Sequence, residues 1–243
     1  MHDIRYDAVH DEIFVGNPFA QAILTFRGGA TGEEAPIRII QGPHTHMQTP
    51  DVLEVDAVHN EIFVPDIEGI LVFPRDAKGD TAPLRILKSG RGRVAVDPVH
   101  NLLITGGNIT VNGKRQNAIQ VFNRTDDGDA KPLAIISGPK TGLITAEPYG
   151  VDPEHGWILV AQGSLSYEPE IYFDRSKDIG MVGIWSINDN GDVPPRWRLD
   201  KGMRKPRGVA FNAKNKELYV VDMSLNAMLT YSLPEMFEPQ KKQ

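Results

Sequence analysis

Two histidines, His44 and His46, stand one residue apart in the stretch GPHTHMQTP. In an extended segment alternate residues point to the same side, so both imidazoles could ligate one metal ion, such as zinc. Two ligands do not complete a site, and Asp51 or Asp66 would have to supply a third. The alternative, which we favour, is an ordinary connecting segment in which the two histidines hold no metal.

Four of the other histidines recur at one position of a repeated stretch, which begins DAVH at Asp7 and again at Asp56. These histidines are His10, His59, His100 and His155. A catalytic residue is not usually copied once per repeat, so we expect them to serve the structure of a turn. The repeated stretches are DAVHDEIFV, DAVHNEIFV, DPVHNLLIT, DPEHGWILV and NAKNKELYV, spaced by about 50 residues.

Each repeat has the pattern of four short strands, rich in β-branched and aromatic residues and separated by polar turns. One turn position favours a left-handed backbone, and it holds Asp11, Asn60, Asn101 and Gly156 in the first four copies. Lys216 departs from this rule in the fifth copy. A period near 50 residues is typical of a propeller blade and too long for most helical repeats.

The sequence therefore predicts an all-β fold, a single β-propeller domain over residues 1–243 with about five four-stranded blades. The expected blades are residues 1–42, 43–90, 91–138, 139–202 and 203–243. The last blade lacks its fourth strand, because the chain ends soon after Glu238 and Pro239. One alternative is a piece of a six-bladed ring, whose open edge would favour a homodimer through strand pairing.

Residues at the ends of the predicted strands could gather at the mouth of a central channel. We expect Asp51, Glu147 and Arg207 to precede first strands, and Asp66, Asn108 and Asp222 to follow second strands. Polar groups that converge on a funnel can bind a small polar ligand, and a guanidinium favours an anionic one. The alternative is a solvated channel mouth, where the same residue types are expected.

Two insertions lie between second and third strands, on the face expected to carry this mouth. Gly107–Asn117 is predicted to be a short polar loop, and Ser164–Gly180 a longer one with three aromatic residues. Insertions that gather on one face often mark where a repeat protein binds its partner.

Three runs resemble the repeat of bacterial NHL-type propellers, within the six-bladed lactonase-like superfamily. They are PLRILKSGRGRVAVDPVHNLLIT, PIRIIQGPHTHMQTPDVLEVDAVHNEIFV and GPKTGLITAEPYGVDPEHG. The resemblance implies the propeller fold, but such proteins include lactonases, lyases, peptide-releasing enzymes and binding scaffolds. In calcium-dependent lactonases an Asp that Asp222 matches binds the metal, but Arg207 stands where that family carries Asn. A cation there opposes a bound divalent ion.

Composition narrows the classes of function. The chain has 243 residues, no cysteine and a formal net charge of −6, which argues against a nucleic-acid surface and rules out thiol chemistry. No apolar run approaches the roughly 20 residues of a membrane helix, and MHDIRYD is not a secretion leader. We therefore expect a soluble protein without a membrane partner; the compartment is open, since a longer precursor could be exported.

We favour a non-catalytic binding or protein-interaction scaffold, whose partner is a protein or a small polar or anionic ligand. The alternative is a divalent-metal-dependent, lactonase-like hydrolase acting on a small anionic or cyclic ester substrate, with Glu147, Asp66 and Asp222 around the ion. No nucleophile elbow, phosphate loop or HExxH motif is present. A calcium or zinc ion is thus the only cofactor that the residues suggest.

Overall fold

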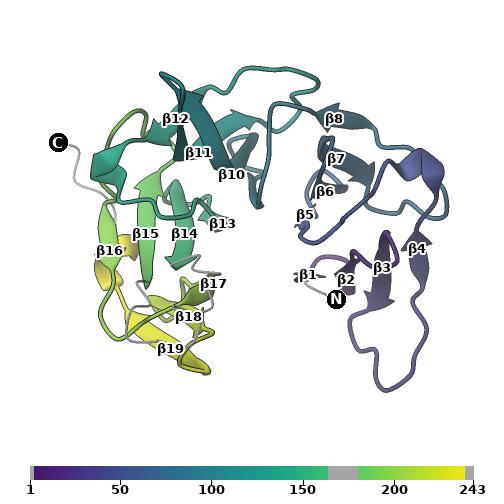
Figure 1. Cartoon of the computed structure of the whole chain (residues 1–243). Coiled ribbons are helices and arrows are strands. Elements are labelled where there is room, and N and C mark those ends of the chain that lie inside the picture. The colour runs from purple at the N-terminus through teal and green to yellow at the C-terminus, as the bar shows by residue number, and fades with distance from the viewer. Residues whose placement is uncertain (1–2, 164–179, 239–243) are drawn as a thin grey trace. The chain divides into compact units, whose positions relative to one another are not determined.

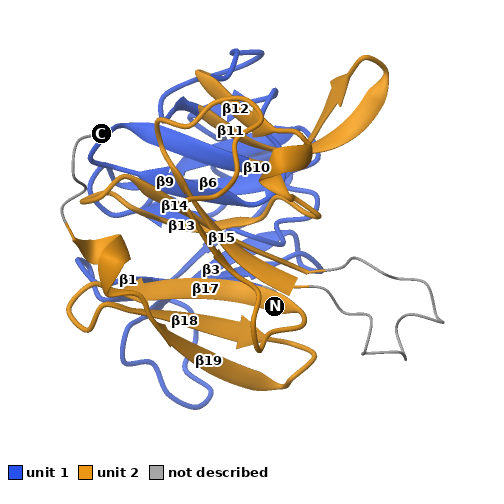
Figure 2. Cartoon of the chain, turned by 90° about the vertical axis from the view of Figure 1, so that its left-hand side faces the viewer, with its two compact units in different colours: residues 1–105, 122–132 blue, residues 106–121, 133–243 orange. Residues whose placement is uncertain are grey.

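The computed structural model describes residues 3–163 and 180–238. They form two compact units, shown in separate colours in Figure 2. Unit 1 comprises Met1–Thr105 with Phe122–Pro132, and unit 2 comprises Gly106–Val121 with Leu133–Gln243. The third sheet contributes residues to both units.

The described residues form five antiparallel sheets, in which each strand pairs with the next one along the chain (Figure 1). In unit 1 the first sheet has β1 (Asp3–Asp7), β2 (Glu12–Asn17), β3 (Ala22–Arg27) and β4 (Arg38–Ile40). The second has β5 (Glu54–Asp56), β6 (Glu61–Asp66), β7 (Gly69–Pro74) and β8 (Arg85–Leu87). The third sheet, which is divided between the two units, has β9 (Val94–Asp97), β10 (Leu102–Val111), β11 (Lys114–Asn123) and β12 (Ala134–Ser137).

Unit 2 holds the last two sheets. The fourth has β13 (Pro148–Asp152), β14 (Trp157–Gly163), β15 (Gly180–Ser186) and β16 (Trp197–Leu199). The fifth has three strands among the described residues, β17 (Pro206–Asn212), β18 (Glu217–Asp222) and β19 (Ala227–Ser232). The helical elements described are the short 3-10 turns η1 (Pro43–Thr45), η2 (Pro139–Thr141) and η4 (Pro234–Phe237). The prediction of an all-β chain is confirmed, and the last sheet has three strands within residues 180–238; the homodimer through its edge stays a prediction.

The core lies between neighbouring sheets, and strand alternation explains how one strand serves two of them. In β6, Ile62 and Val64 pack with Phe14 of the first sheet, while Phe63 between them packs with Leu103 of the third. Successive side chains of a strand point to opposite faces, so a strand buried on both faces is apolar throughout. The run EIFV in the repeat is therefore a sandwiched strand.

The repeated turn is held by a buried aspartate. Oδ1 of Asp56 accepts hydrogen bonds from the amides of Val58 and His59, and Oδ2 lies 2.8 Å from Nδ1 of His59. The same Asp–His contact measures 2.7–2.8 Å in the other three copies, at His10, His100 and His155. The four histidines thus make the structural contact expected of them.

The predicted left-handed turn position is confirmed in all five copies, including the one that carries lysine. Its φ angle is 54° at Asp11, 57° at Asn60, 58° at Asn101, 70° at Gly156 and 56° at Lys216. A lysine gains no local hydrogen bond that would offset the steric strain of this conformation, whereas asparagine tolerates it.

Replacing Lys216 by asparagine is therefore expected to raise the free energy of unfolding by about 0.5–1 kcal/mol. Urea denaturation followed by circular dichroism measures the change. Lys214→Asn is the matched control, because this exposed residue of the same turn does not have a positive φ. Equal shifts in both variants would show that the left-handed position is not the cause.

One predicted loop is an extension of the sheet. Gly107–Asn117 was expected to be a polar loop, but β10 runs on to Val111 and β11 begins at Lys114. The turn between them is Asn112–Gly113, with φ angles of 50° and 74°. Asn-Gly is a strong signal for a two-residue hairpin turn, and here it outweighs the polar composition of the flanks.

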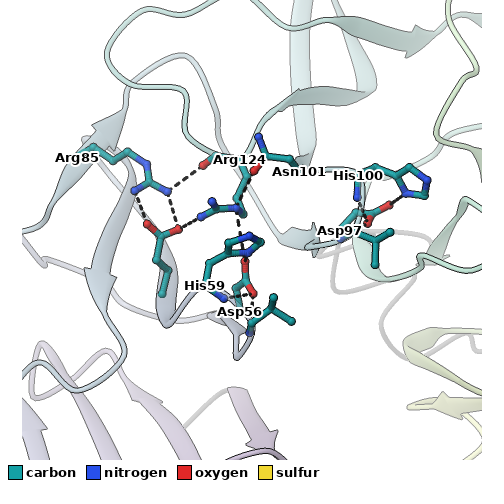
Figure 3. A network of polar contacts seen from close by, with 10 residues as sticks. Asp56, His59, Arg85, Asp97, His100, Asn101 and Arg124 are labelled. Carbon is teal, nitrogen blue, oxygen red and sulfur yellow. Dashed lines mark hydrogen bonds and ion pairs between the residues drawn. The ribbon is translucent and has the colours of Figure 1, made fainter.

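At two places in unit 1, a glutamate joins neighbouring sheets by binding two arginines. Glu61 of the second sheet receives two hydrogen bonds from Arg85, at 2.6 and 2.8 Å, and a further ion pair from Arg124, which follows β11. Arg124 also donates from Nε to Asn101, at 3.0 Å (Figure 3). The first and second sheets share the same arrangement, with Glu12 bound by Arg38 and Arg75.

Candidate functional site

The two histidines of the predicted metal pair do not lie in an extended segment. His44 is part of η1, and His46 follows it with a φ of 61°. Nδ1 of His44 lies 2.6 Å from Asp80, and Nδ1 of His46 lies 3.2 Å from Glu68. The geometric premise of the pair was therefore wrong, because Pro43 starts a tight turn that breaks the alternation. A metal bound by these histidines stays a prediction.

Asp66 and Asp222 end second strands, and both turn back to hold the segment that precedes their own sheet. Asp66 in unit 1 accepts hydrogen bonds from the amides of Gln48, Thr49 and Ile67, at 2.6–3.2 Å. Gln162 of β14 does the same with its amide oxygen, at 2.8 Å from the nitrogen of Ile144. We call these three side chains the linker clasps.

Asp222 is the most fully engaged linker clasp. Its Oδ2 accepts from the amides of Arg204 and Lys205, at 2.6 and 2.9 Å, and its Oδ1 accepts from Ser224 and Leu225, both at 3.0 Å. The residue is 1% exposed. Four backbone donors occupy the two oxygens, so ligation of a metal ion would have to displace these amides.

The first strands of unit 1 carry a charged cluster that the predicted mouth did not include. Arg5 contacts Asp3 and Glu54, both at 3.2 Å, and Arg93 reaches Asp3 at the same distance. Burial raises the pKa of Glu54, and the positive charge of Arg5 opposes this shift. Arg5 stands two residues before Asp7, and Glu54 stands two residues before Asp56, the aspartates of their repeats. The shared position in the repeat and strand alternation could therefore have identified the two side chains as lying on equivalent faces of their strands. Asp51 is exposed.

In unit 2 the structure brings Glu147 and Arg207 together. Nη1 of Arg207 lies 3.2 Å from Oε1 of Glu147, whose Oε2 accepts a hydrogen bond from the hydroxyl of Tyr149 at 3.0 Å. Both charged side chains are about a quarter exposed, at 27% and 26%. Any anionic ligand of Arg207 therefore shares the guanidinium with this carboxylate.

Two cavities of unit 2 include predicted mouth residues. The first has a volume of about 450 Å³ and lies on the fifth sheet, lined by Arg207, Val221, Asp222, Met223, Asn226, Ala227 and Met228. The second has a volume of about 350 Å³, lies beside the β10–β11 hairpin and includes Asn108. Arg207 and Asp222 thus share one cavity and Asn108 lines another, whereas Asp51 and Asp66 belong to unit 1.

The residues do not fit the calcium site that the lactonase resemblance implies. Asp222 is saturated by amides, Glu147 is bound by a guanidinium and a phenol, and Arg207 replaces a neutral oxygen ligand with a cation. Across residues 3–163 and 180–238, no group of three or more His, Asp or Glu side chains could hold a metal ion. We derive no catalytic step from these residues.

Comparison with known proteins identifies the architecture and no family. No family model matches the chain, and no curated protein does. A chain in the crystal structure of a nidogen/laminin complex is similar over 96% of this chain and 76% of its own length, with 18% identity and a TM-score of 0.60. The chain is a β-propeller.

A second solved structure with the same fold is the hydrazine synthase of Kuenenia stuttgartiensis. It matches 93% of this propeller at 13% identity and a TM-score of 0.64, and the propeller spans 63% of that chain. At such identities the likeness concerns the fold alone. No helix in the described part of the chain is long and apolar enough to cross a membrane.

Proposed function

We propose that this β-propeller, of the NHL type that its repeats resemble, is a non-catalytic scaffold that binds a protein partner. One observation carries the proposal: an exposed apolar patch at the β18–β19 end of the fifth sheet borders the cavity at Arg207. The patch consists of Val221, Met223, Leu225 and Met228, which are 52%, 51%, 37% and 67% exposed. We call these four residues with Arg207 the fifth-sheet patch.

Strand register explains why this side of the sheet is apolar and open. Val221 of β18 pairs with Met228 of β19, and both side chains are exposed. The neighbouring residue Val220 points to the opposite side and is fully buried with Leu218. The sheet therefore has one packed apolar face, and its opposite face is apolar and exposed at the Val221–Met228 pair.

The composition of the patch suits contact with a polypeptide. Methionine and arginine are enriched in the cores of protein interfaces, and flexible methionines adapt to the shape of a partner. Gathered apolar side chains on a surface mark interaction sites more often than isolated ones do. A similar fold occurs in a nidogen/laminin complex, which agrees with a binding role for propellers.

The predicted contribution of the longer insertion to partner binding lies outside the described residues, except for Gly180 at its end. Removal of residues 164–179 tests it separately: the chain should still fold but lose a partner that this segment contacts. Binding of a small ligand at the channel mouth also remains a proposal.

A displayed library of random 12-residue peptides, selected against the whole chain, tests the fifth-sheet patch. We expect Met228→Asp to weaken binding of the selected peptides by about tenfold or more, because a carboxylate would be desolvated at the centre of the contact. Thr230→Asp is the matched control, since Thr230 is an exposed residue of the same strand outside the patch. Peptides that bind both variants equally would contradict the proposal, and so would a selection that yields no binder.

A further inference from the structure

The cavity beside the β10–β11 hairpin is built by two segments of unit 2. One wall is the end of the hairpin, with Asn108, Arg115, Gln116 and Asn117. The other wall is the segment that leaves β12, with Gly138, Pro139, Thr141 and Leu143. Its volume of about 350 Å³ is at the lower end of the range of small-molecule sites.

Hydrogen bonds fix the two walls to each other. The side-chain amide of Asn117 donates to the carbonyls of Leu143 and Ile144, at 3.4 and 2.6 Å, and the hydroxyl of Ser137 donates to the carbonyl of Asn117 at 2.7 Å. On the far side, Gln162 holds the same segment as a linker clasp and donates to the carbonyl of Gly142, at 3.0 Å. The cavity is thus formed before any ligand arrives.

Hydrogen-bond donors in this cavity remain uncommitted. Arg115 has no hydrogen bond or ion pair with any residue that the structure describes, and the same holds for the side chain of Asn108. Gln116 accepts a weak bond from Ser137 through Oε1, which leaves its NH₂ group unused. In contrast, Asn117 and Thr141 are bound to backbone carbonyls.

The charge of the lining is positive and uncompensated. None of the eight lining residues is acidic, and Arg115 is the only charged one among them. The carboxylate of Asp192, which lies behind Gly138, accepts from the amide of Lys140 at 2.7 Å. It is not part of the lining, so it does not occupy the guanidinium.

From these contacts we propose that the cavity binds a small organic carboxylate. The guanidinium of Arg115 matches a planar carboxylate with two parallel donors, and the amides of Asn108 and Gln116 supply further donors. A single cation suits a monoanion, and Leu143 with Pro139 provides an apolar surface for the body of the ligand. This site is separate from the fifth-sheet patch and does not depend on its function.

Benzoate, benzamide and inorganic phosphate are suitable probes, because they separate carboxylate recognition from apolar burial and from general anion binding. Binding to the whole chain is measured by ligand-observed NMR and calorimetry. Benzoate is expected to bind, and Arg115→Gln is expected to weaken it by about tenfold or more. Lys114→Gln removes the same charge from the adjacent residue of the hairpin, which does not line the cavity, and should change affinity less than twofold.

Three results of the measurements with benzoate would overturn the proposal. They are an absence of benzoate binding at 20 mM (roughly the weakest affinity relevant to a ligand site), equal losses in Arg115→Gln and Lys114→Gln, and equal affinities for benzoate and benzamide. Tighter binding of phosphate than of benzoate at the same residues would also overturn it, since the site would then recognise phosphate groups. Melting temperatures of both variants show whether any loss reflects unfolding.

Discussion

Glu61→Gln is expected to lower the free energy of unfolding by about 3–5 kcal/mol, the range for breaking a buried ion pair by removing one partner. Two guanidiniums converge on this carboxylate, and Arg124 and Glu61 are only 7% and 9% exposed. A neutral amide would leave two largely buried guanidiniums next to each other, with Asp56, whose Oδ2 lies 3.6 Å from Nε of Arg124, as the remaining counter-charge. Urea denaturation of the whole chain measures the loss.

Glu34→Gln is the matched control. Glu34 also binds an arginine through both oxygens, but this partner, Arg27, is 54% exposed at its side chain. Water screens such a pair, and removing it should change stability far less than Glu61→Gln does. Equal losses in the two variants would contradict the buried-network account.

The same network predicts how stability depends on pH. Burial raises the pKa of Glu61, but the hydrogen bonds and charges of Arg85 and Arg124 outweigh burial and lower the pKa below its ordinary value. A carboxyl whose pKa is lower in the folded state contributes stability above its unfolded pKa and loses it as the pH falls through the folded value. The stability difference between the wild type and Glu61→Gln should therefore shrink as the pH falls below about 4.

Asp222→Asn is expected to lower the free energy of unfolding by about 2–4 kcal/mol. Each oxygen of Asp222 accepts two backbone amides, and asparagine replaces one oxygen with an NH₂ donor. Two amides, those of Arg204 and Lys205 or those of Ser224 and Leu225, would then face another donor. Hydrogen exchange should become faster at the affected pair.

Asp200→Asn serves as the control for this prediction. Asp200 pairs with Arg198 at 3.0 Å, but both side chains are 48% exposed, so their loss should leave stability nearly unchanged. A small effect in both variants would mean that the four amides at Asp222 find water or other acceptors. The linker clasp would then contribute little to the fold.

The repeat allowed the fold to be predicted because each copy specifies the same local structure. The run EIFV predicted a strand, and Asn60 and Asn101 predicted left-handed turns; the structure agrees on each. The hairpin at Asn112–Gly113 was missed although its dipeptide was a usable signal. Polar composition is weaker evidence for a loop than Asn-Gly is for a turn.

The candidate site was less predictable, because residue type does not show which partners a side chain already has. Asp222 and Asp66 have the chemistry of metal ligands, yet both bind backbone amides of the preceding segment. Arg115 was not predicted at all, since its importance comes from the lack of a described partner and from the cavity beside it. Such facts depend on tertiary contacts and appear only in the structure.

Thermal melting of the whole chain in excess calcium and in excess chelator tests most directly whether the acidic residues serve the fold rather than a metal centre. We predict that the wild-type curves superimpose, and that Asp222→Asn melts lower by the same amount in both solutions. A wild-type melting temperature that calcium raises and chelator lowers, with this response lost in Asp222→Asn, would contradict the account and favour a metal-dependent hydrolase.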